Sequence, residues 1–212
     1  IKIIKSGFRR FHSKVNYNCN ENLKNFFQKP NKILLFMSRL DRQKGLIELM
    51  SAWNQVIDQA EFYNWWLLIA GFGDLKKQVI ANANKSNSRI IFNGPIDGDE
   101  KNFILQNSKG FILPSYNEGL PISVLEALSF KTTCLISESC NINNLIDSNI
   151  FLKIDITKKS NNIKESILKL FELSEKDLEE REESGLKYLE KNHNWEEILY
   201  ETKIFYEDLC KN

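Results

Sequence analysis

The chain has 212 residues, of which 42% are hydrophobic and 27% charged, a balance that excludes wholesale disorder. A chain of this length forms one large domain, or a domain with an appendage, and buries about 70% of the surface that it exposes when unfolded. Its 29 basic and 28 acidic residues give a formal net charge of +1, so the basic excess typical of nucleic-acid-binding proteins is missing.

Neither metal-binding nor membrane-spanning patterns are found in the sequence. The four cysteines form no C-x-x-C pair, and the two histidines, His12 and His193, lie far apart. We therefore expect reduced, structural thiols in a cytosolic protein and no zinc site. Neither histidine follows an expected strand, so neither is expected to be a catalytic base. No apolar run approaches the roughly 18 residues that span a membrane.

The start of the chain predicts a piece of a longer protein, because Ile1 opens directly in a strand-like stretch without an initiating Met. The first fifteen residues contain Lys and Arg but no acidic residue. Two neighbours stay open for this stretch: an anionic lipid surface or a domain missing from this chain.

Short apolar runs alternate with amphipathic segments up to about residue 156. The runs are almost continuously apolar, which is typical of parallel strands covered by helices on both faces. Expected strands are 33–37, 66–70, 89–93, 110–113, 132–136 and 150–154. Expected helices are a short one at 21–27 and longer ones at about 45–60, 74–86, 99–107, 121–130 and 141–147. This order predicts an α/β fold with a Rossmann-like, doubly wound parallel sheet of about six strands.

The strand pattern stops after about residue 156, and the rest of the chain reads as a helical tail. Helices are expected at 160–172, 174–191 and 194–210. We interpret 1–156 as the sheet domain and 157–212 as helices packed on it. For 194–210, core packing is favoured over an exposed patch that contacts another domain.

Ligands of open parallel sheets bind beyond the carboxyl ends of the strands, so the loops there are the candidate site. Arg39 and Lys44 follow the first strand and suit a diphosphate, although solvated surface cations are the alternative. In the next loop Gly71 and Gly73 predict a tight turn before a helix that Asp74 could cap. The dinucleotide fingerprint G-x-G-x-x-G fails there, because Lys76 stands at the last glycine position.

The loop after the third strand contains a D-x-D, Asp97 and Asp99. This spacing is used by metal-dependent sugar transferases, but a helix is expected to begin here. Helix capping by one of the two carboxylates is therefore the favoured interpretation.

The segment after the fourth strand carries the most specific pattern. Glu118 and Glu126 stand eight apart, one in the loop and one in the following helix, and Pro121 suits the helix start. Backbone N–H groups from Gly119 to Ser123 would form an anion site at the helix N-terminus. Carboxylates repel phosphate but bind hydroxyls, so the pattern predicts a ligand with hydroxyls on both sides of a diphosphate, such as a nucleotide sugar.

These motifs together resemble the C-terminal, donor-binding domain of group 1 (family 4) glycosyltransferases, which have the GT-B fold. The resemblance covers about residues 1–156 and rests on five segments in order. They are IIKSGF at 3–8, SRLDRQKG at 38–45, IAGFGD at 69–74, IFNGPI at 91–96 and PSYNEGLPISVLEAL at 114–128. The last contains the family's E-x7-E pattern.

The resemblance implies roles for individual residues. Glu118 would contact the hydroxyls of the donor sugar, and Glu126 those of the ribose. Arg39 and Lys44 would hold the diphosphate and stabilise its charge as it leaves. The remaining donor-binding positions would be the phosphate cradle of Gly119, Leu120, Pro121, Ile122 and Ser123, where Pro121 has no N–H, and the base-facing loop of Gly94, Pro95 and Ile96.

The resemblance also implies a retaining transfer of sugar from a nucleotide diphosphate sugar, without a cofactor or bound metal. The acceptor, a glycan or a lipid-linked molecule, would bind an N-terminal domain absent from this chain, so the isolated piece would be inactive. A cytoplasmic location, with peripheral association at the inner membrane face, and a role in polysaccharide or glycolipid synthesis follow by analogy. No nucleic-acid partner is expected.

Two other classes stay open. One is a non-catalytic module that binds nucleotide sugars, since the family's usual A-x-G-x-P after the E-x7-E helix is replaced by SFKTT at 129–133. The other is an unrelated Rossmann-like domain that binds NAD, against which the failed glycine fingerprint argues.

Overall fold

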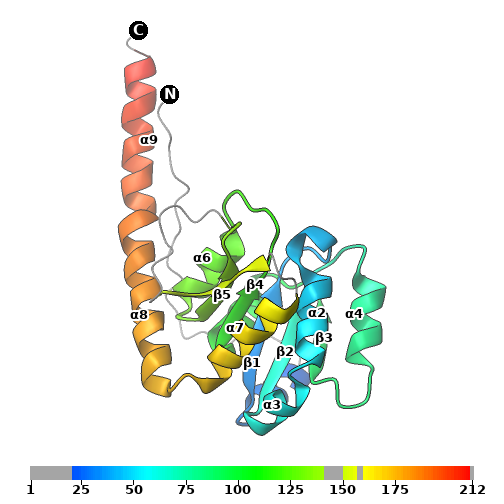
Figure 1. The fold of residues 1–212 in the computed structure, drawn as a ribbon. Coiled ribbons are helices and arrows are strands. Elements are labelled where there is room, and N and C mark those ends of the chain that lie inside the picture. The colour runs from blue at the N-terminus through cyan, green and yellow to red at the C-terminus, as the bar shows by residue number, and fades with distance from the viewer. Residues whose placement is uncertain (1–20, 141–149, 157–159, 211–212) are drawn as a thin grey trace.

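The protein is a six-stranded, all-parallel sheet covered by helices on both faces (Figure 1), here as a computed structural model that describes residues 21–140, 150–156 and 160–210. The strand order is β3-β2-β1-β4-β5-β6. Helices α2, α4 and α7 cover the face turned toward the viewer in Figure 1, and α5 and α6 cover the other face. The predicted doubly wound α/β fold is therefore confirmed.

The elements follow the hydrophobic pattern of the sequence closely. The strands are β1 (Lys32–Met37), β2 (Trp65–Ala70), β3 (Ile90–Gly94), β4 (Gly110–Leu113), β5 (Thr133–Ser137) and β6 (Phe151–Ile154). The helices are α1 (Glu21–Phe27), η1 (Arg42–Lys44), α2 (Leu46–Asn54), α3 (Ile57–Phe62), α4 (Lys76–Ala83), α5 (Gly98–Asn107), α6 (Ile122–Ser129), α7 (Ser160–Glu172), α8 (Glu175–Asn192) and α9 (Trp195–Leu209). The helix expected at 141–147 lies outside the described residues.

One expected helix, 45–60, is two helices in the structure. The chain turns between α2 and α3 at Gln55 and Val56. Val56 at the turn and Ala60 in α3 are both fully buried, so the change of direction places apolar side chains of the turn and of α3 in the core. Helical periodicity alone does not reveal such a break, because neither glycine nor proline marks it.

The loop after β2 passes very close to the loop after β1. Gly71 and Gly73 have φ values of +144° and +148°, and a Cβ on Gly71 would lie 1.9 Å from the carbonyl oxygen of Ser38. Only glycine tolerates both conditions, which explains the G-x-G as a close backbone approach. The cap expected at Asp74 is wrong, since α4 begins at Lys76 with Leu75 at its N-cap and no side-chain capping bond.

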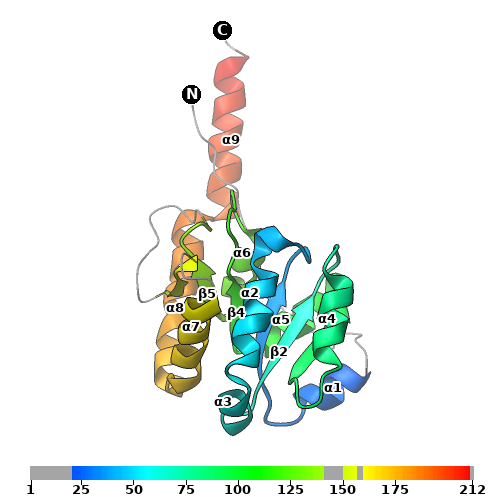
Figure 2. The ribbon, with the colours of Figure 1, turned by 45° about the vertical axis from the view of Figure 1, so that its right-hand side comes forward.

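The last three helices differ in how they meet the domain. Helix α7 packs against α2 and β6, and α8 packs against α6 and β5. In α8, Gly185 leaves room for Leu128, whose side chain would lie 2.7 Å from an added Cβ. Helix α9 instead projects away from the sheet domain (Figures 1 and 2).

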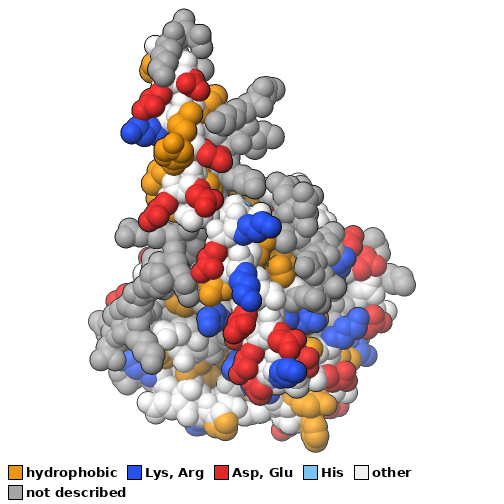
Figure 3. Space-filling model, turned by 90° about the vertical axis from the view of Figure 1, so that its left-hand side faces the viewer, with side chains coloured by type: hydrophobic (Ala, Val, Ile, Leu, Met, Phe, Trp, Pro, Cys, Tyr) orange, Lys and Arg blue, Asp and Glu red, His pale blue; other side chains and the backbone are white. Residues whose placement is uncertain are grey.

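The favoured expectation of core packing therefore fails for α9. Its large apolar side chains Trp195, Leu199, Tyr200 and Tyr206 are exposed. Figure 3 shows hydrophobic side chains along α9, whereas acidic and basic ones alternate over α8. Amphipathic periodicity identifies a helix with an apolar side but says nothing about which surface covers that side.

The thiols of the described residues are free. Cys134 and Cys140 are buried and Cys210 is exposed, while Cys19 lies outside the described residues. His193 ends α8 as its C-cap and is buried, with Nε2 3.0 Å from the hydroxyl of Tyr188. Among the described residues, no helix has the length and apolar character needed to cross a membrane.

Candidate functional site

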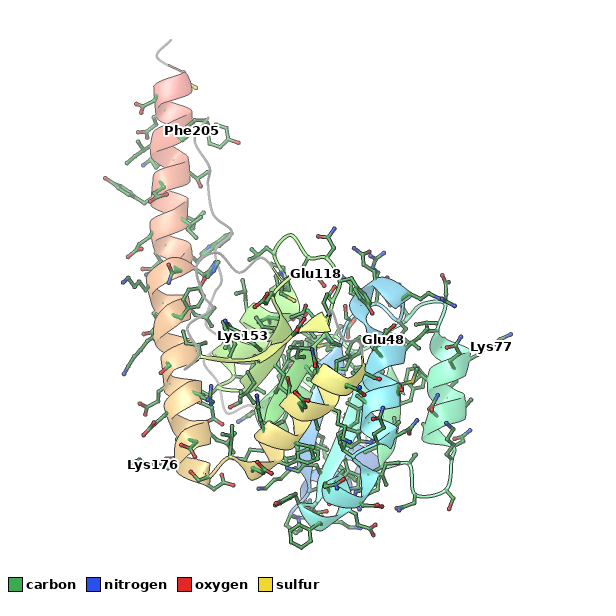
Figure 4. All side chains as sticks on the ribbon, viewed as in Figure 1. Glu48, Lys77, Glu118, Lys153, Lys176 and Phe205 are labelled. Carbon is green, nitrogen blue, oxygen red and sulfur yellow. The ribbon has the colours of Figure 1, made fainter. Side chains whose placement is uncertain are left out.

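The candidate site lies where the strand order reverses, at the carboxyl ends of β1 and β4. These strands are neighbours in the sheet, but their helices leave toward opposite faces, which is the place where open parallel sheets bind ligands. Figure 4 shows Glu118 in the loop above this edge, with Glu48 of α2 on the same side.

The loops after β1 and β4 are tied together by hydrogen bonds at Gln43. Its carbonyl oxygen accepts from the backbone N–H of Tyr116 at 2.8 Å and from the hydroxyl of Ser115 at 3.1 Å. Its side-chain amide donates to the carbonyl of Asn117 at 3.3 Å. The segment that carries Glu118 is therefore anchored to the loop that carries Lys44.

Lys44 is placed by its immediate neighbours in the sequence. Asp41 caps η1 by accepting from the N–H of Lys44 at 3.1 Å. Gly45 has φ +67°, and a Cβ there would lie 2.1 Å from the carbonyl oxygen of Pro114. The chain therefore needs glycine after Lys44 to lie this close to β4.

Lys44 and Glu118 form the central contact of the site. Lys44 Nζ lies 2.6 Å from Glu118 Oε1, and the two side chains are only 11% and 13% exposed. The backbone N–H of Glu118 donates to the carbonyl of Ser139 at 3.1 Å. Two residues 74 positions apart, each predicted as a site residue, are thus in direct contact.

Arg39 has a different environment from Lys44. Its guanidinium lies 3.5 Å from Asp41 Oδ2, and the side chain is 62% exposed. The sequence analysis assigned both cations to a diphosphate. The structure places both in the loop after β1, but each lies beside a different carboxylate.

A second ion pair involves the other carboxylate of the E-x7-E pattern. Glu126 Oε1 accepts from Lys101 Nζ, in α5, at 2.7 Å, and these side chains are 16% and 26% exposed. The formal charges of the two pairs cancel. The two carboxylates therefore do not leave this end of α6 with a net negative charge that would repel an anion.

Unpaired backbone donors lie between the two carboxylates. Helix α6 has Pro121 at its N-cap and no side-chain cap. Within the described part of the chain, no protein acceptor contacts the N–H groups of Gly119, Leu120, Ile122 or Ser123. Added atoms at Gly119 would meet nothing within 4 Å. These N–H groups, at the positive end of the helix dipole, can donate hydrogen bonds to an anionic ligand.

The loop predicted to face the base lies at the end of β3. The carbonyl oxygen of Gly94 accepts from the N–H of Gly71 at 2.7 Å, Pro95 is exposed, and Ile96 packs partly against the core. The structure shows no hydrogen bond or ion pair from this loop to Glu118 or Glu126. Its expected role stays a prediction.

The two D-x-D residues lie at the start of α5. Asp97 occupies the N-cap of α5 but makes no side-chain capping bond, and both Asp97 and Asp99 are exposed. The capping interpretation therefore places Asp97 correctly at the N-cap, but the capping hydrogen bond that it implies is not formed. No group of three or more His, Cys, Asp or Glu side chains in the described ranges could hold a metal ion.

Sequence reasoning missed three contributors: Lys101, Gln43 and the pair of Tyr116 with Glu48. Burial raises the pKa of Tyr116, and the nearby Glu48 carboxylate raises it further. Glu48 Oε2 is buried without a hydrogen-bond partner among the described residues. The sequence did contain one signal for Lys101: it is a charged residue in the first turn of a helix that follows the end of a strand.

Comparisons with known proteins identify the family of this chain. The family model described as glycosyl transferases group 1 matches residues 20–187. The chain therefore belongs to the group 1 glycosyltransferases, and the resemblance drawn from the motifs is confirmed.

Individual relatives are longer than this chain. An uncharacterized glycosyltransferase of Methanocaldococcus jannaschii is 26% identical over 144 residues, which are 65% of this chain and 36% of that protein. The chain thus matches only about a third of that relative's length.

Solved structures share the fold. Sucrose-phosphate synthase from Thermosynechococcus elongatus superposes with a TM-score of 0.76 at 20% identity, covering 99% of this chain and 53% of that one. WaaG, a glycosyltransferase involved in lipopolysaccharide biosynthesis, gives a TM-score of 0.70 at 19% identity, covering 89% of this chain and 52% of its own.

Proposed function

We propose that this chain is the donor-binding domain of a retaining glycosyltransferase that uses a nucleoside diphosphate sugar. One observation carries the proposal: Glu118 and Glu126, each opposed by a lysine, flank the unpaired N–H groups at the start of α6. Carboxylates bind sugar and ribose hydroxyls, and the N–H groups between them bind the diphosphate.

The proposed chemistry is electrostatic. As the bond between the anomeric carbon and the diphosphate oxygen breaks, negative charge grows on the leaving diphosphate. Lys44 and Arg39 stabilise that charge, and the N–H groups of Leu120, Ile122 and Ser123 add fixed dipoles. Lys44 exchanges its contact with Glu118 for one with the phosphate, which leaves the Glu118 carboxylate to accept from sugar hydroxyls. No metal or cofactor takes part in this scheme.

The acceptor in this proposal is a glycan or a lipid-linked molecule bound by a part of the enzyme outside this chain. The transfer would take place in the cytoplasm, at the inner face of the membrane where the acceptor is lipid-linked. This class of acceptor is drawn by analogy with WaaG, a glycosyltransferase involved in lipopolysaccharide biosynthesis that shares the fold. On the same grounds, the isolated chain binds donor without transferring sugar.

Calorimetric titration of the 212-residue chain with UDP, GDP and ADP, and with their glucose or mannose conjugates, tests the proposal. We expect one nucleotide to bind saturably and Glu126→Ala to weaken its binding about tenfold, because a hydrogen bond to a charged group is lost. Glu180→Ala, which removes an exposed carboxylate from α8, is the matched control and should bind like the wild type. NAD is titrated in the same way, and saturable binding of NAD alone would contradict the proposal.

A further inference from the structure

Lys101 is the cation at this site that no sequence motif indicates. It lies at the fourth position of α5, and its ammonium group donates to Glu126 Oε1 at 2.7 Å. The two residues are 25 positions apart, and they come from the helices that precede and follow β4 in the sequence. The tertiary fold therefore brings a specific partner to the second carboxylate of the E-x7-E pattern.

Local electrostatics do not explain a lysine at this position. A cation near a helix N-terminus faces the positive end of the dipole, and Asp99 and Glu100 already occupy the favourable positions of that turn. Removing two opposite charges from water costs much of what their attraction gains, so a pair this buried contributes little net stability. Its main effect is to fix the position of the Glu126 carboxylate.

The geometry leaves one oxygen of Glu126 available. Oε1 accepts from Lys101, whereas Oε2 has no hydrogen-bond donor among the described residues. A carboxylate held through one oxygen is ordered before a ligand arrives, which lowers the entropy lost when the other oxygen accepts a hydrogen bond.

We propose that Lys101 is a positioning residue for ribose recognition: it orients Glu126 so that Oε2 accepts from a ribose hydroxyl of the nucleotide donor. The inference rests on the proposed function, because it takes Glu126 to bind the ribose. Lys101 acts through Glu126 and does not itself contact the diphosphate.

The test compares ribonucleotides with their 2′-deoxy counterparts on the 212-residue chain. Dissociation constants are measured by calorimetry for UDP, GDP and ADP and for the three 2′-deoxynucleoside diphosphates. For the nucleotide that binds, we expect the wild type to prefer the ribo form by about tenfold. Lys101→Met should reduce this preference to about twofold or less, because it weakens the binding of the ribonucleotide and leaves the binding of the deoxynucleotide almost unchanged.

Further variants distinguish positioning from other roles. Lys101→Arg keeps a charged donor and should restore most of the ribose preference, and Lys101→Gln replaces Lys101→Met if the latter does not fold. Lys176→Met removes an exposed charge of α8 and should leave the preference intact, which controls for net charge. Circular dichroism melting confirms that each variant is folded.

The outcomes separate this inference from the proposed function. Equal weakening of ribo and deoxy forms by Lys101→Met would mean a direct phosphate contact or a structural role, and would overturn the inference. An unchanged preference would overturn it as well, and if Glu126→Gln abolished the preference in the same experiment, the proposed function would stand. A wild type that binds no nucleotide, or a Glu126→Gln variant without effect, would overturn both.

Discussion

The contact between Lys44 and Glu118 joins two residues that sequence motifs identify separately. Both side chains are almost buried and lie 2.6 Å apart. Removing one member of such a pair leaves the other charge unpaired and poorly solvated. The stability lost in this way is larger than the net stability that the intact pair contributes.

We expect the single variants Lys44→Met and Glu118→Gln each to lower the free energy of unfolding by about 2 kcal/mol. The double variant should lose at least about 1 kcal/mol less than the sum of the two single losses, because it leaves no unpaired charge. Urea denaturation of all four proteins measures this coupling. Strictly additive losses would show that the two side chains do not interact in solution.

Gly45 is the residue that lets Lys44 approach β4. Its positive φ and the 2.1 Å separation of an added Cβ from the Pro114 carbonyl oxygen predict that Gly45→Ala lowers the free energy of unfolding by about 3 kcal/mol. Gly119→Ala is the control, since nothing lies within 4 Å of its added Cβ, and should change stability by less than about 0.5 kcal/mol. Thermal or urea unfolding that ranked the two variants equally would contradict this account.

At the scale of single elements, the start of α8 is the clearest case of local sequence fixing a helix end. Ser174 accepts from the N–H of Asp177, and the Asp177 carboxylate accepts from both the hydroxyl and the N–H of Ser174. These hydrogen bonds lower the pKa of Asp177, as expected for a capping box.

This capping box predicts a pH dependence. Folding lowers the pKa of Asp177. The contribution of this carboxylate to stability is therefore complete above the pKa of an Asp in the unfolded chain, about 4. It is lost as the pH falls through the lower pKa of Asp177 in the folded protein. Wild type should therefore be more stable than Asp177→Asn at pH 7, with the difference vanishing toward pH 2. Urea unfolding across that range measures it. A difference between the two proteins that stayed constant from pH 7 to pH 2 would contradict this account.

Whole-molecule arrangement separates α8 from α9. Helix α8 lies against α6 and β5, whereas α9 projects from the domain with Trp195 and Tyr200 exposed (Figures 2 and 3). Ile198, 9% exposed, is the most buried of its described side chains.

A chain ending at His193 should consequently unfold with almost the same free energy as the full chain, within about 1 kcal/mol. A chain ending at Leu173 should be far less stable, because it also loses the buried Leu178 and Leu189 of α8. Urea denaturation of both truncated chains tests this. A large loss on removing α9 alone would mean that it packs on the domain in solution.

The sequence by itself determined the elements and the class of site. Continuous apolar runs such as ILLFM at 33–37 can only be buried on both faces, and the spacing of Glu118, Pro121 and Glu126 places a helix start between two carboxylates. These are local properties of the chain, because strand burial, helix periodicity and turn chemistry act over a few residues.

Only the tertiary structure decided which of these residues meet. The partners of Glu118 and Glu126 are Lys44 and Lys101, and the 74 and 25 positions between them are spanned by the fold rather than by any repeating pattern. Likewise, the sequence predicts that the helix at 195–209 has an apolar side, but it does not predict that this side is exposed. Long-range contacts depend on how β1, β4 and their helices are ordered in the sheet, and no short window of sequence contains that order.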